Sequence, residues 1–345
     1  MGEYKAADNR YDGYNNAGFY KRCGNSGLLL PPISLGFWHN FGSIDDYDNM
    51  KQMCFTAFDH GITHFDLANN YGPVPGSAEE NFGRILKEEM GAYRDEMIIS
   101  TKAGYGMWDG PYGDWGSRKY LIASLDQSLK RMGIPYVDIF YHHRMDPNTP
   151  LEETMETLAQ IVRSGKALYV GLSNYDGPTM ARAERILDEL HCPFVINQNR
   201  YNILDRTIEA NGLLRQTYAS GKGLICFSPL AQGMLTDRYL TSMPEDSRAV
   251  RSGVFLHEED VLEKRPLLLK LNEIAKGYDM SLSELAIAWL LNKPEVTSVL
   301  IGASRSEQIL KNLKAVEKHE KHTLTESDMQ AIEQVLVERC GFSGC

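Results

Sequence analysis

Residues 137–172, VDIFYHHRMDPNTPLEETMETLAQIVRSGKALYVGL, contain a complete strand, helix and second strand. Apolar residues fill the runs Val137 to Tyr141 and Ala167 to Leu172, which is typical of buried parallel strands. Between them, Leu151 to Ser164 has the spacing of an amphipathic helix. Because parallel neighbouring strands need a crossover connection of this kind, the stretch predicts a βαβ unit.

The same alternation continues along the chain in both directions. Six more strand-like runs occur: Ile33 to Gly36, Thr63 to Leu67, Met97 to Thr101, Phe194 to Asn197, Leu224 to Ser228 and Ser298 to Ile301. Helical spacing fills most of the intervals: Ala78 to Met90, Ser117 to Met132, Gly177 to Leu190, Arg206 to Ser220 and Ser306 to Lys318. Eight strand and helix units predict an α/β protein with one closed (β/α)8 TIM barrel, because an open doubly wound sheet usually has about five to seven strands.

Two segments lie outside this repeat. Tyr20 to Pro32 predicts an N-terminal β-hairpin that turns at Asn25-Ser26-Gly27. Leu230 to Asn292, between the seventh and eighth strands, contains two helical stretches and a polar loop near Thr241 to Asp260. We interpret it as a lid or insertion. No linker divides the chain, so we expect one domain over residues 1–345.

Composition and charge exclude several classes of protein. The chain is 43% hydrophobic and 24% charged, which is ordinary for a globular protein with a sizeable core. Its net charge of -10 argues against binding to nucleic acid or to an anionic membrane. Met1 to Gly18 is too polar for a signal peptide or a membrane span.

The cysteines give no sign of a metal site or a disulfide framework. They are scattered through the chain without metal-ligand spacing, at Cys23, Cys54, Cys192, Cys226, Cys340 and Cys345. We expect reduced thiols, no bound metal and a cytoplasmic protein.

Titratable residues gather at the carboxyl ends of neighbouring strands, where barrel proteins carry their chemistry. Asp66, Lys102 and His143 end the second, third and fourth strands, and Tyr71 follows closely. An ammonium next to a phenol stabilises the phenolate and would lower the phenol pKa from about 10. Asp66 would keep Lys102 charged, and His143 would donate a hydrogen bond to a substrate carbonyl.

Each of these residues also has an ordinary structural interpretation. A single aspartate at a strand end is more often a helix cap, and a single lysine is usually a solvated surface residue. His142 and His143 face opposite sides of an extended strand, so only one can enter the site. Alternation alone does not say which.

Several motifs together resemble the aldo-keto reductases, from about Tyr20 to Cys345. They are GITHFDLA at 61–68 with Tyr71-Gly72, Ser100-Thr101-Lys102, His143, VGLSN at 170–174, Gln198 and FSPL at 227–230. The resemblance implies hydride transfer from NADPH to an aldehyde. It implies Asp66, Tyr71, Lys102 and His143 as the catalytic residues, with Tyr71 as the proton donor, and it selects His143 over His142.

The resemblance also implies how NADPH/NADP+ is held at its nicotinamide end. Ser173, Asn174 and Gln198 would bind the carboxamide, with Asp66 nearby. Phe227 would stack on the ring, Trp38 would line the cleft, and Phe37 and Asp66 would also bind the cofactor. Phe227 and Trp38 could equally be packing residues. No Gly-x-Gly-x-x-Gly turn follows the first strand, so we do not expect a Rossmann fold.

Two loops are candidates for the phosphates and the adenosine. The first comprises Ser228, Pro229, Leu230, Ala231, Gln232, Gly233 and Arg238, of which Arg238 could equally be an ordinary surface residue. The second follows the eighth strand, where a helix N-terminus suits a phosphate, and it comprises Gly302, Ala303, Ser304, Arg305, Gln308 and Asn312. Ser304, Gln308 and Asn312 would share one helical face, and Arg305 favours the 2′-phosphate of NADPH over NADH.

Within the family, the sequence most resembles the bacterial glyceraldehyde 3-phosphate and methylglyoxal reductase branch, which is similar to potassium channel β subunits. Members of this branch tend to form tetramers or octamers, so we expect a homo-oligomer. Further carriers of this resemblance include the terminal Gly341-Phe342-Ser343-Gly344. Two positions depart from the usual pattern: Asp237-Arg238 stands in place of Gly-Lys, and Lys311 in place of an acidic residue.

The expected substrate is a small aldehyde, and cationic residues near the rim loops suggest a phosphorylated one: Arg144, Arg118 and Lys119. Two other functions stay open. His143 argues against the first, a redox-sensing subunit that resembles the channel β subunits, because those proteins tend to have asparagine there. Lys102 argues against the second, a metal-dependent hydrolase, because the lysine charge would repel a metal ion.

Overall fold

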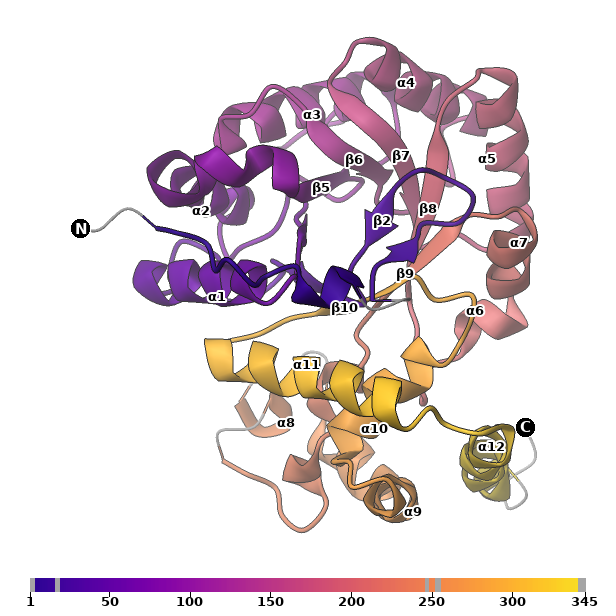
Figure 1. Cartoon of the computed structure of the whole chain (residues 1–345). Coiled ribbons are helices and arrows are strands. Elements are labelled where there is room, and N and C mark those ends of the chain that lie inside the picture. The colour runs from indigo at the N-terminus through magenta and orange to yellow at the C-terminus, as the bar shows by residue number, and fades with distance from the viewer. Residues whose placement is uncertain (1–3, 16–18, 246–247, 252–255, 341–345) are drawn as a thin grey trace.

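The structure, a computed structural model, describes residues 4–15, 19–245, 248–251 and 256–340. Parts of the predicted polar loop, residues 246–247 and 252–255, and the terminal residues 341–345 lie outside this described part. Eight parallel strands close into a barrel in the order β10-β3-β4-β5-β6-β7-β8-β9 (Figure 1). The predicted TIM barrel is therefore confirmed.

The barrel strands agree closely with the predicted runs. Their bounds are β3 Ile33–Gly36, β4 His64–Asp66, β5 Ile98–Ala103, β6 Val137–His142, β7 Ala167–Ser173, β8 Phe194–Arg200, β9 Gly223–Phe227 and β10 Ser298–Ile301. The largest difference is at β8, which continues to Arg200, three residues beyond the predicted end at Asn197. Its added residues pair in register with β9, through Gln198 with Ile225 and Asn199 with Cys226.

Helices surround the barrel (Figure 1). Their bounds are α1 Tyr47–Asp59, α2 Ser77–Ile85, α3 Arg118–Met132, α4 Leu151–Arg163, α5 Gly177–Glu189, α6 Thr207–Ala210, α7 Leu213–Ala219, α8 Arg248–Arg251, α9 Glu258–Gly277, α10 Leu282–Leu291, α11 Ser306–Lys321 and α12 Glu326–Cys340. Elements α8, α9 and α10 follow β9 and precede β10, so the predicted insertion between the last two barrel strands is helical.

Two helical predictions need correction, and two helices, α1 and α12, were not predicted. In α1, the residues Met50, Met53, Cys54, Ala57 and Phe58 are buried at helical spacing. The predicted helix 206–220 is two helices, α6 and α7, because Gly212 has a φ of 78° and the Asn211 side chain accepts from the Leu213 N–H. The predicted helix 78–90 ends as an α-helix at Ile85 and continues as one π-helical turn, Leu86–Met90.

Alternation along the strands divides the apolar residues between two sides of the barrel wall. Ile139, Tyr141 and Ile225 pack in the smaller core cluster inside the barrel. Phe65 and Phe140 belong to the larger cluster between the strands and the helices. Room for the large inner ring of Tyr141 exists because position 171 is glycine: a Cβ there would lie 2.3 Å from that ring.

The predicted hairpin is present as β1 Lys21–Arg22 and β2 Leu29–Leu30. It covers the amino-terminal end of the barrel. Cys23 contacts the Val195 carbonyl at the start of β8, and the Asn25 N–H donates to the Gly221 carbonyl just before β9. Because one end of the barrel is closed, its opposite end, where the strands terminate in titratable residues, is the place for a site.

Two points follow for the sequence-based expectations. Cys23, Cys54, Cys192 and Cys226 are buried free thiols, as predicted for these four. Within the described part of the chain, none of the helices is both long enough and apolar enough to cross a bilayer.

Two buried histidines make the stability of the fold depend on pH. Burial lowers the pKa of His64 and of His142 from 6.5 to about 4. The folded state therefore binds fewer protons than the unfolded state between these values, so stability is full above pH 6.5 and falls as the pH approaches 4. One pKa unit is about 1.4 kcal/mol, so each histidine accounts for about 3 kcal/mol of this fall.

We predict that His142→Gln will lessen the loss of unfolding free energy between pH 7 and pH 4 by about 3 kcal/mol. Urea unfolding at a series of pH values measures this loss. An identical loss in the variant and the wild type would show that His142 is not buried as the neutral form.

Candidate active site

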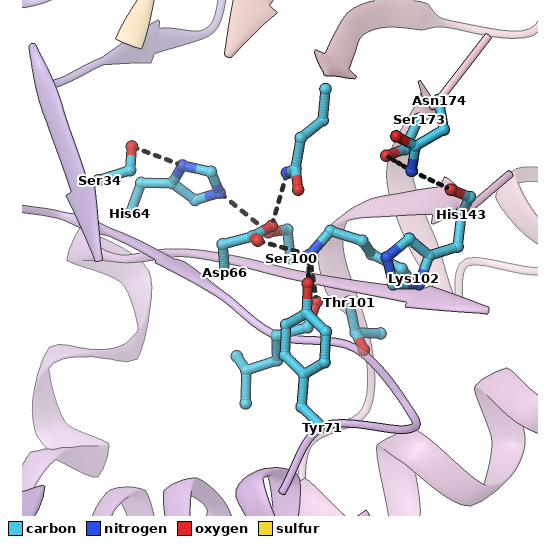
Figure 2. Close-up of polar contacts among 12 residues, drawn as sticks. Ser34, His64, Asp66, Tyr71, Ser100, Thr101, Lys102, His143, Ser173 and Asn174 are labelled. Carbon is cyan, nitrogen blue, oxygen red and sulfur yellow. Dashed lines mark hydrogen bonds and ion pairs between the residues drawn. The ribbon is translucent and has the colours of Figure 1, made fainter. Parts of the chain in front are cut away.

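Four predicted residues meet at the carboxyl end of the barrel. Asp66 ends β4, Lys102 lies near the end of β5, His143 follows β6, and Tyr71 lies in the loop after β4. Figure 2 shows the Asp66, Lys102 and Tyr71 side chains pointing toward one another. The Lys102 Nζ atom lies 2.5 Å from Asp66 Oδ2 and 3.3 Å from Tyr71 Oη. The amine and the phenol are therefore in direct contact.

Asp66 and Lys102 form an ion pair whose two side chains are completely buried. The barrel compensates both charges with further hydrogen bonds. Asp66 Oδ1 accepts from Ser100 Oγ at 2.6 Å and from Gln198 Nε2 at 3.1 Å. Lys102 also donates to the Leu67 carbonyl at 2.7 Å. These bonds matter because a buried ion pair offsets its desolvation cost only when its remaining donors and acceptors are satisfied.

The pKa of Tyr71 differs from the expectation. Burial raises the pKa of this phenol well above 10, and the Asp66 carboxylate and Tyr105 raise it further. The sequence revealed the neighbouring ammonium but not the degree of burial, so the predicted lowering of the pKa is wrong. Burial also lowers the pKa of Lys102, against the opposing effect of Asp66. Tyr71 is therefore a protonated phenol at neutral pH, as a proton donor must be.

The structure places His143, and not His142, on the side of Tyr71. The His143 and Tyr71 rings lie 5.9 Å apart, and burial holds the pKa of His143 well below 6.5. A neutral imidazole keeps one N–H donor, and the Nδ1 atom of His143 has no partner among the described residues. His142 points the other way, with its Nδ1 atom 2.6 Å from Tyr175 Oη.

The three predicted carboxamide residues lie together. Ser173, the last residue of β7, is paired in register with Gln198, two residues before the end of β8. Asn174 has a φ of 56°, and its side-chain nitrogen donates to the His143 carbonyl at 2.9 Å and to Ser173 Oγ at 3.2 Å (Figure 2). Since Gln198 also bonds to Asp66, this group is joined directly to the ion pair.

The loop after β9 has an unusual backbone. Ser228, Ala231 and Gln232 all have positive φ values, of 54°, 47° and 60°, and Gly233 has 97°. Such strain in residues other than glycine is concentrated at functional sites. Within the same loop Pro229 is buried and Leu230 is partly buried, whereas Arg238, in a short 3-10 helix beyond it, is exposed.

The predicted phosphate loop after β10 lies at the same end of the barrel. Gly302 and Arg305 are exposed, whereas Ala303 and Asn312 are buried. One detail needs correction: α11 begins at Ser306, so Ser304 lies before the helix and does not share its face with Gln308 and Asn312. Instead, the Ser304 N–H donates to Gln308 Oε1 at 2.8 Å.

The aromatic predictions have mixed outcomes. Trp38 is 39% exposed, and Phe227 is partly buried against the inner cluster. Phe37, which was expected to bind the cofactor, has a side chain that points away from the barrel interior. Its ring is fully buried among Phe41, Phe65 and Phe82 on the outer side of the barrel wall. Only the backbone of Phe37 could contact a cofactor.

The two positions that depart from the family pattern are close together. Lys311 Nζ, on α11, lies 3.9 Å from Asp237 Oδ2, and Asp237 Oδ1 accepts from the Leu282 N–H. Asp237 thus stands where the pattern has glycine, Lys311 stands where it has an acidic residue, and the two side chains form an ion pair. Both side chains are about half exposed, so the pair contributes little to stability.

Sequence analysis missed the structure of the loop that follows β5. The Arg144 guanidinium lies between the rings of Tyr105 and Trp115, at 4.2 and 3.5 Å, and bonds to Asp114 at 2.8 Å. The Tyr105 ring in turn lies 4.7 Å from His143. The aromatic residues clustered at 105–115 were a sequence signal that this loop forms an aromatic wall beside the site. Arg118, proposed as a rim cation, points instead to Glu156 and Gln160 of α4.

No cluster of three or more His, Cys, Asp or Glu side chains that could hold a metal ion occurs in the residues that the structure describes. A closed barrel whose strand ends hold a buried Asp and Lys pair against a tyrosine is the arrangement of a barrel enzyme that uses the phenol as a proton donor. The chain belongs to the aldo/keto reductase family, whose family model matches residues 32–337.

Individual members of the family are similar to this chain over most of its length. Two Escherichia coli proteins, from strains O157:H7 and K12, are named L-glyceraldehyde 3-phosphate reductase. Each is 55% identical to this chain over 301 residues, which cover 86% of this chain and 87% of the relative. An Arabidopsis thaliana protein named "Probable voltage-gated potassium channel subunit beta" is 36% identical over 309 residues, 86% of this chain and 91% of that protein. The predicted family is confirmed, and so is the predicted similarity to glyceraldehyde 3-phosphate reductases and to potassium channel β subunits.

The ion pair generates a stability prediction. Removing one partner leaves the other charge buried and uncompensated, so Lys102→Met should lower the free energy of unfolding at pH 7 by about 3 kcal/mol or more. The double variant Lys102→Met with Asp66→Leu should recover most of this loss, because it contains no buried charge. Denaturant unfolding of both variants measures the difference.

Lys166→Met provides the control, since Lys166 pairs with Asp126 at 2.6 Å on the exposed surface. It should cost about 0.5 kcal/mol or less. If Lys102→Met costs no more than this control, the pair does not have the buried character described above.

Proposed function

We propose that the protein reduces small aldehydes to alcohols with NADPH, with Tyr71 as the proton donor. The observation that supports this most strongly is the short chain from Asp66 through Lys102 to the Tyr71 hydroxyl in a buried site. The raised pKa keeps the phenol protonated until the substrate oxygen accepts its proton. Once Tyr71 gives up its proton, the ammonium at 3.3 Å stabilises the phenolate that remains.

His143 orients the substrate in this proposal. Its neutral imidazole donates a hydrogen bond to the carbonyl oxygen, so that this oxygen lies between His143 and Tyr71. Tyr105, packed edge to face on His143, fixes the ring orientation and helps to exclude water. The alcohol oxygen then receives the Tyr71 proton.

The residues at the rim fit a nicotinamide cofactor. NADPH, when bound, supplies the hydride. Ser173, Asn174 and Gln198 offer a compact group of hydroxyl and amide functions suited to a carboxamide, and the Gln198 contact with Asp66 links them to the proton donor. The exposed Arg305 at the start of α11 and the exposed Arg238 supply positive charge for the phosphates, including the 2′-phosphate.

Glyceraldehyde 3-phosphate and methylglyoxal are the substrates that we propose first. The names of the Escherichia coli relatives support the former, and the Arg144 guanidinium beside the site provides a cation at the rim. Rates with these two aldehydes and with benzaldehyde, each with NADPH, would rank them. A cofactor that stays bound without turnover of any aldehyde would favour the alternative, a redox-sensing subunit like the channel β subunits.

A homo-oligomer, as a tetramer or octamer, and a cytoplasmic location complete the proposal. Free buried thiols at the four described cysteines suit a reducing compartment.

We predict that Tyr71→Phe will lower kcat for aldehyde reduction by about 10³-fold, because it removes the general acid. The dissociation constant for NADPH, measured by fluorescence titration, should stay within about twofold of the wild type. Tyr175→Phe is the matched control, since that hydroxyl bonds to His142 outside the site. Full activity of Tyr71→Phe would disprove its role as the acid.

We also predict that Arg305→Gln will weaken NADPH binding about tenfold, because it removes a charge-assisted contact with the 2′-phosphate. Binding of NADH, which lacks that phosphate, should not change. Equal weakening for both nucleotides would place Arg305 elsewhere along the cofactor.

A further inference from the structure

A row of polar side chains runs through the interior of the barrel and ends on Asp66. Ser298 Oγ lies 2.7 Å from Ser34 Oγ, and Ser34 Oγ lies 2.9 Å from His64 Nδ1. On the other side of the ring, His64 Nε2 lies 2.9 Å from Ser100 Oγ, which donates to Asp66 Oδ1 at 2.6 Å. All of these side chains are fully buried. Figure 2 shows the part from Ser34 to Asp66.

The donors and acceptors of this row can be assigned in only one way. Ser100 gives its single hydroxyl hydrogen to Asp66, so its oxygen must accept from His64 Nε2–H. His64 is neutral at pH 7, because burial lowers its pKa to about 4. Its Nδ1 atom is therefore an acceptor for Ser34, and Ser34 accepts in turn from Ser298. Every bond in the row points toward the carboxylate.

The location of this row is unusual for a purely structural feature. TIM barrel interiors are dominated by branched aliphatic side chains, and exchanging a hydrogen-bonded polar pair for apolar groups can be nearly neutral for stability. Here four polar side chains from β3, β4, β5 and β10 form instead one chain that ends at a single oxygen of the carboxylate. The other oxygen binds Lys102. The row thus acts on the carboxylate oxygen that does not bind Lys102.

We propose that His64, supported by Ser34 and Ser298, is a positioning residue of the reductase that aims the Ser100 hydroxyl at Asp66 and so orients the Asp66 and Lys102 pair toward Tyr71. Successive hydrogen bonds polarise one another, so the His64 N–H strengthens the donation from Ser100. A carboxylate held in this way keeps the ammonium at its place beside the phenol. This inference rests on the proposed function of Tyr71.

The experiment compares His64→Leu, which removes the donor and the acceptor, with His64→Gln, which keeps one of each. His64→Leu should lower kcat about tenfold, the amount expected for a lost hydrogen bond to a charged group. The KM for aldehyde and the dissociation constant for NADPH should stay within about twofold, because neither ligand touches His64. His64→Gln should recover most of the lost kcat.

Ser34→Ala tests the row at a distance, and it keeps the inference testable if His64→Leu does not fold. It should lower kcat several-fold, although Ser34 lies four hydrogen bonds from Lys102. Thr157→Val is the matched control, since this buried hydroxyl donates only to the Glu153 carbonyl of its own helix. Thermal unfolding of every variant separates loss of fold from loss of positioning.

Two results would overturn the inference: an unchanged kcat in both His64→Leu and Ser34→Ala, or equal losses in His64→Leu and His64→Gln. Absence of NADPH-dependent reduction in the wild type would instead count against the proposed function. In that event ¹⁵N NMR of labelled histidines still decides the geometry. The Nε2–H tautomer of His64 supports the row, and the Nδ1–H tautomer refutes it.

Discussion

The contact between the Lys102 ammonium and the Asp66 carboxylate is the constraint around which the barrel is organised. Both side chains are fully buried, and charges in such surroundings are tolerated only when nearly every hydrogen-bonding position is filled. Ser100, Gln198 and the Leu67 carbonyl provide this compensation from β5, β8 and the end of β4. Strands that are far apart in the sequence must therefore be placed accurately relative to one another. The closed barrel provides this placement.

The closed barrel also explains why the site is at one end. The hairpin packs over the amino-terminal end, where it contacts Val195 and Gly221. The loops at the other end are free to differ from one another, so one forms an aromatic wall around Arg144 and others present hydroxyl, amide and arginine side chains at the rim. A rigid charged centre and variable loops are thus separate parts of one structure, and specificity can change without disturbing the ion pair.

Periodicity and position at strand ends were sufficient to predict the barrel, Asp66 and Lys102, because short-range sequence pattern determines which residues end a strand. Alternation left His142 and His143 both open, and only the family resemblance selected His143. The same alternation could have placed His64 inside beside Asp66, and Phe37 outside, and it was not applied to either. Other features depend on long-range contacts that no local pattern records. They include the Asp237 and Lys311 pair and the burial that raises the pKa of Tyr71. For the Arg144 stack, the aromatic residues at 105–115 were a local signal, but the arginine that packs against them was not.

The most direct test of this account is the solvent isotope effect on a single turnover, in which a saturating aldehyde is mixed with the enzyme and NADPH is followed by its absorbance. If the Tyr71 proton moves as the carbonyl is reduced, the turnover must be slower in D2O than in H2O, and NADPH deuterated at the transferred hydrogen must slow the same step. A turnover that responds to the deuterated NADPH but proceeds equally fast in both solvents would contradict the assignment of the buried phenol as the proton source.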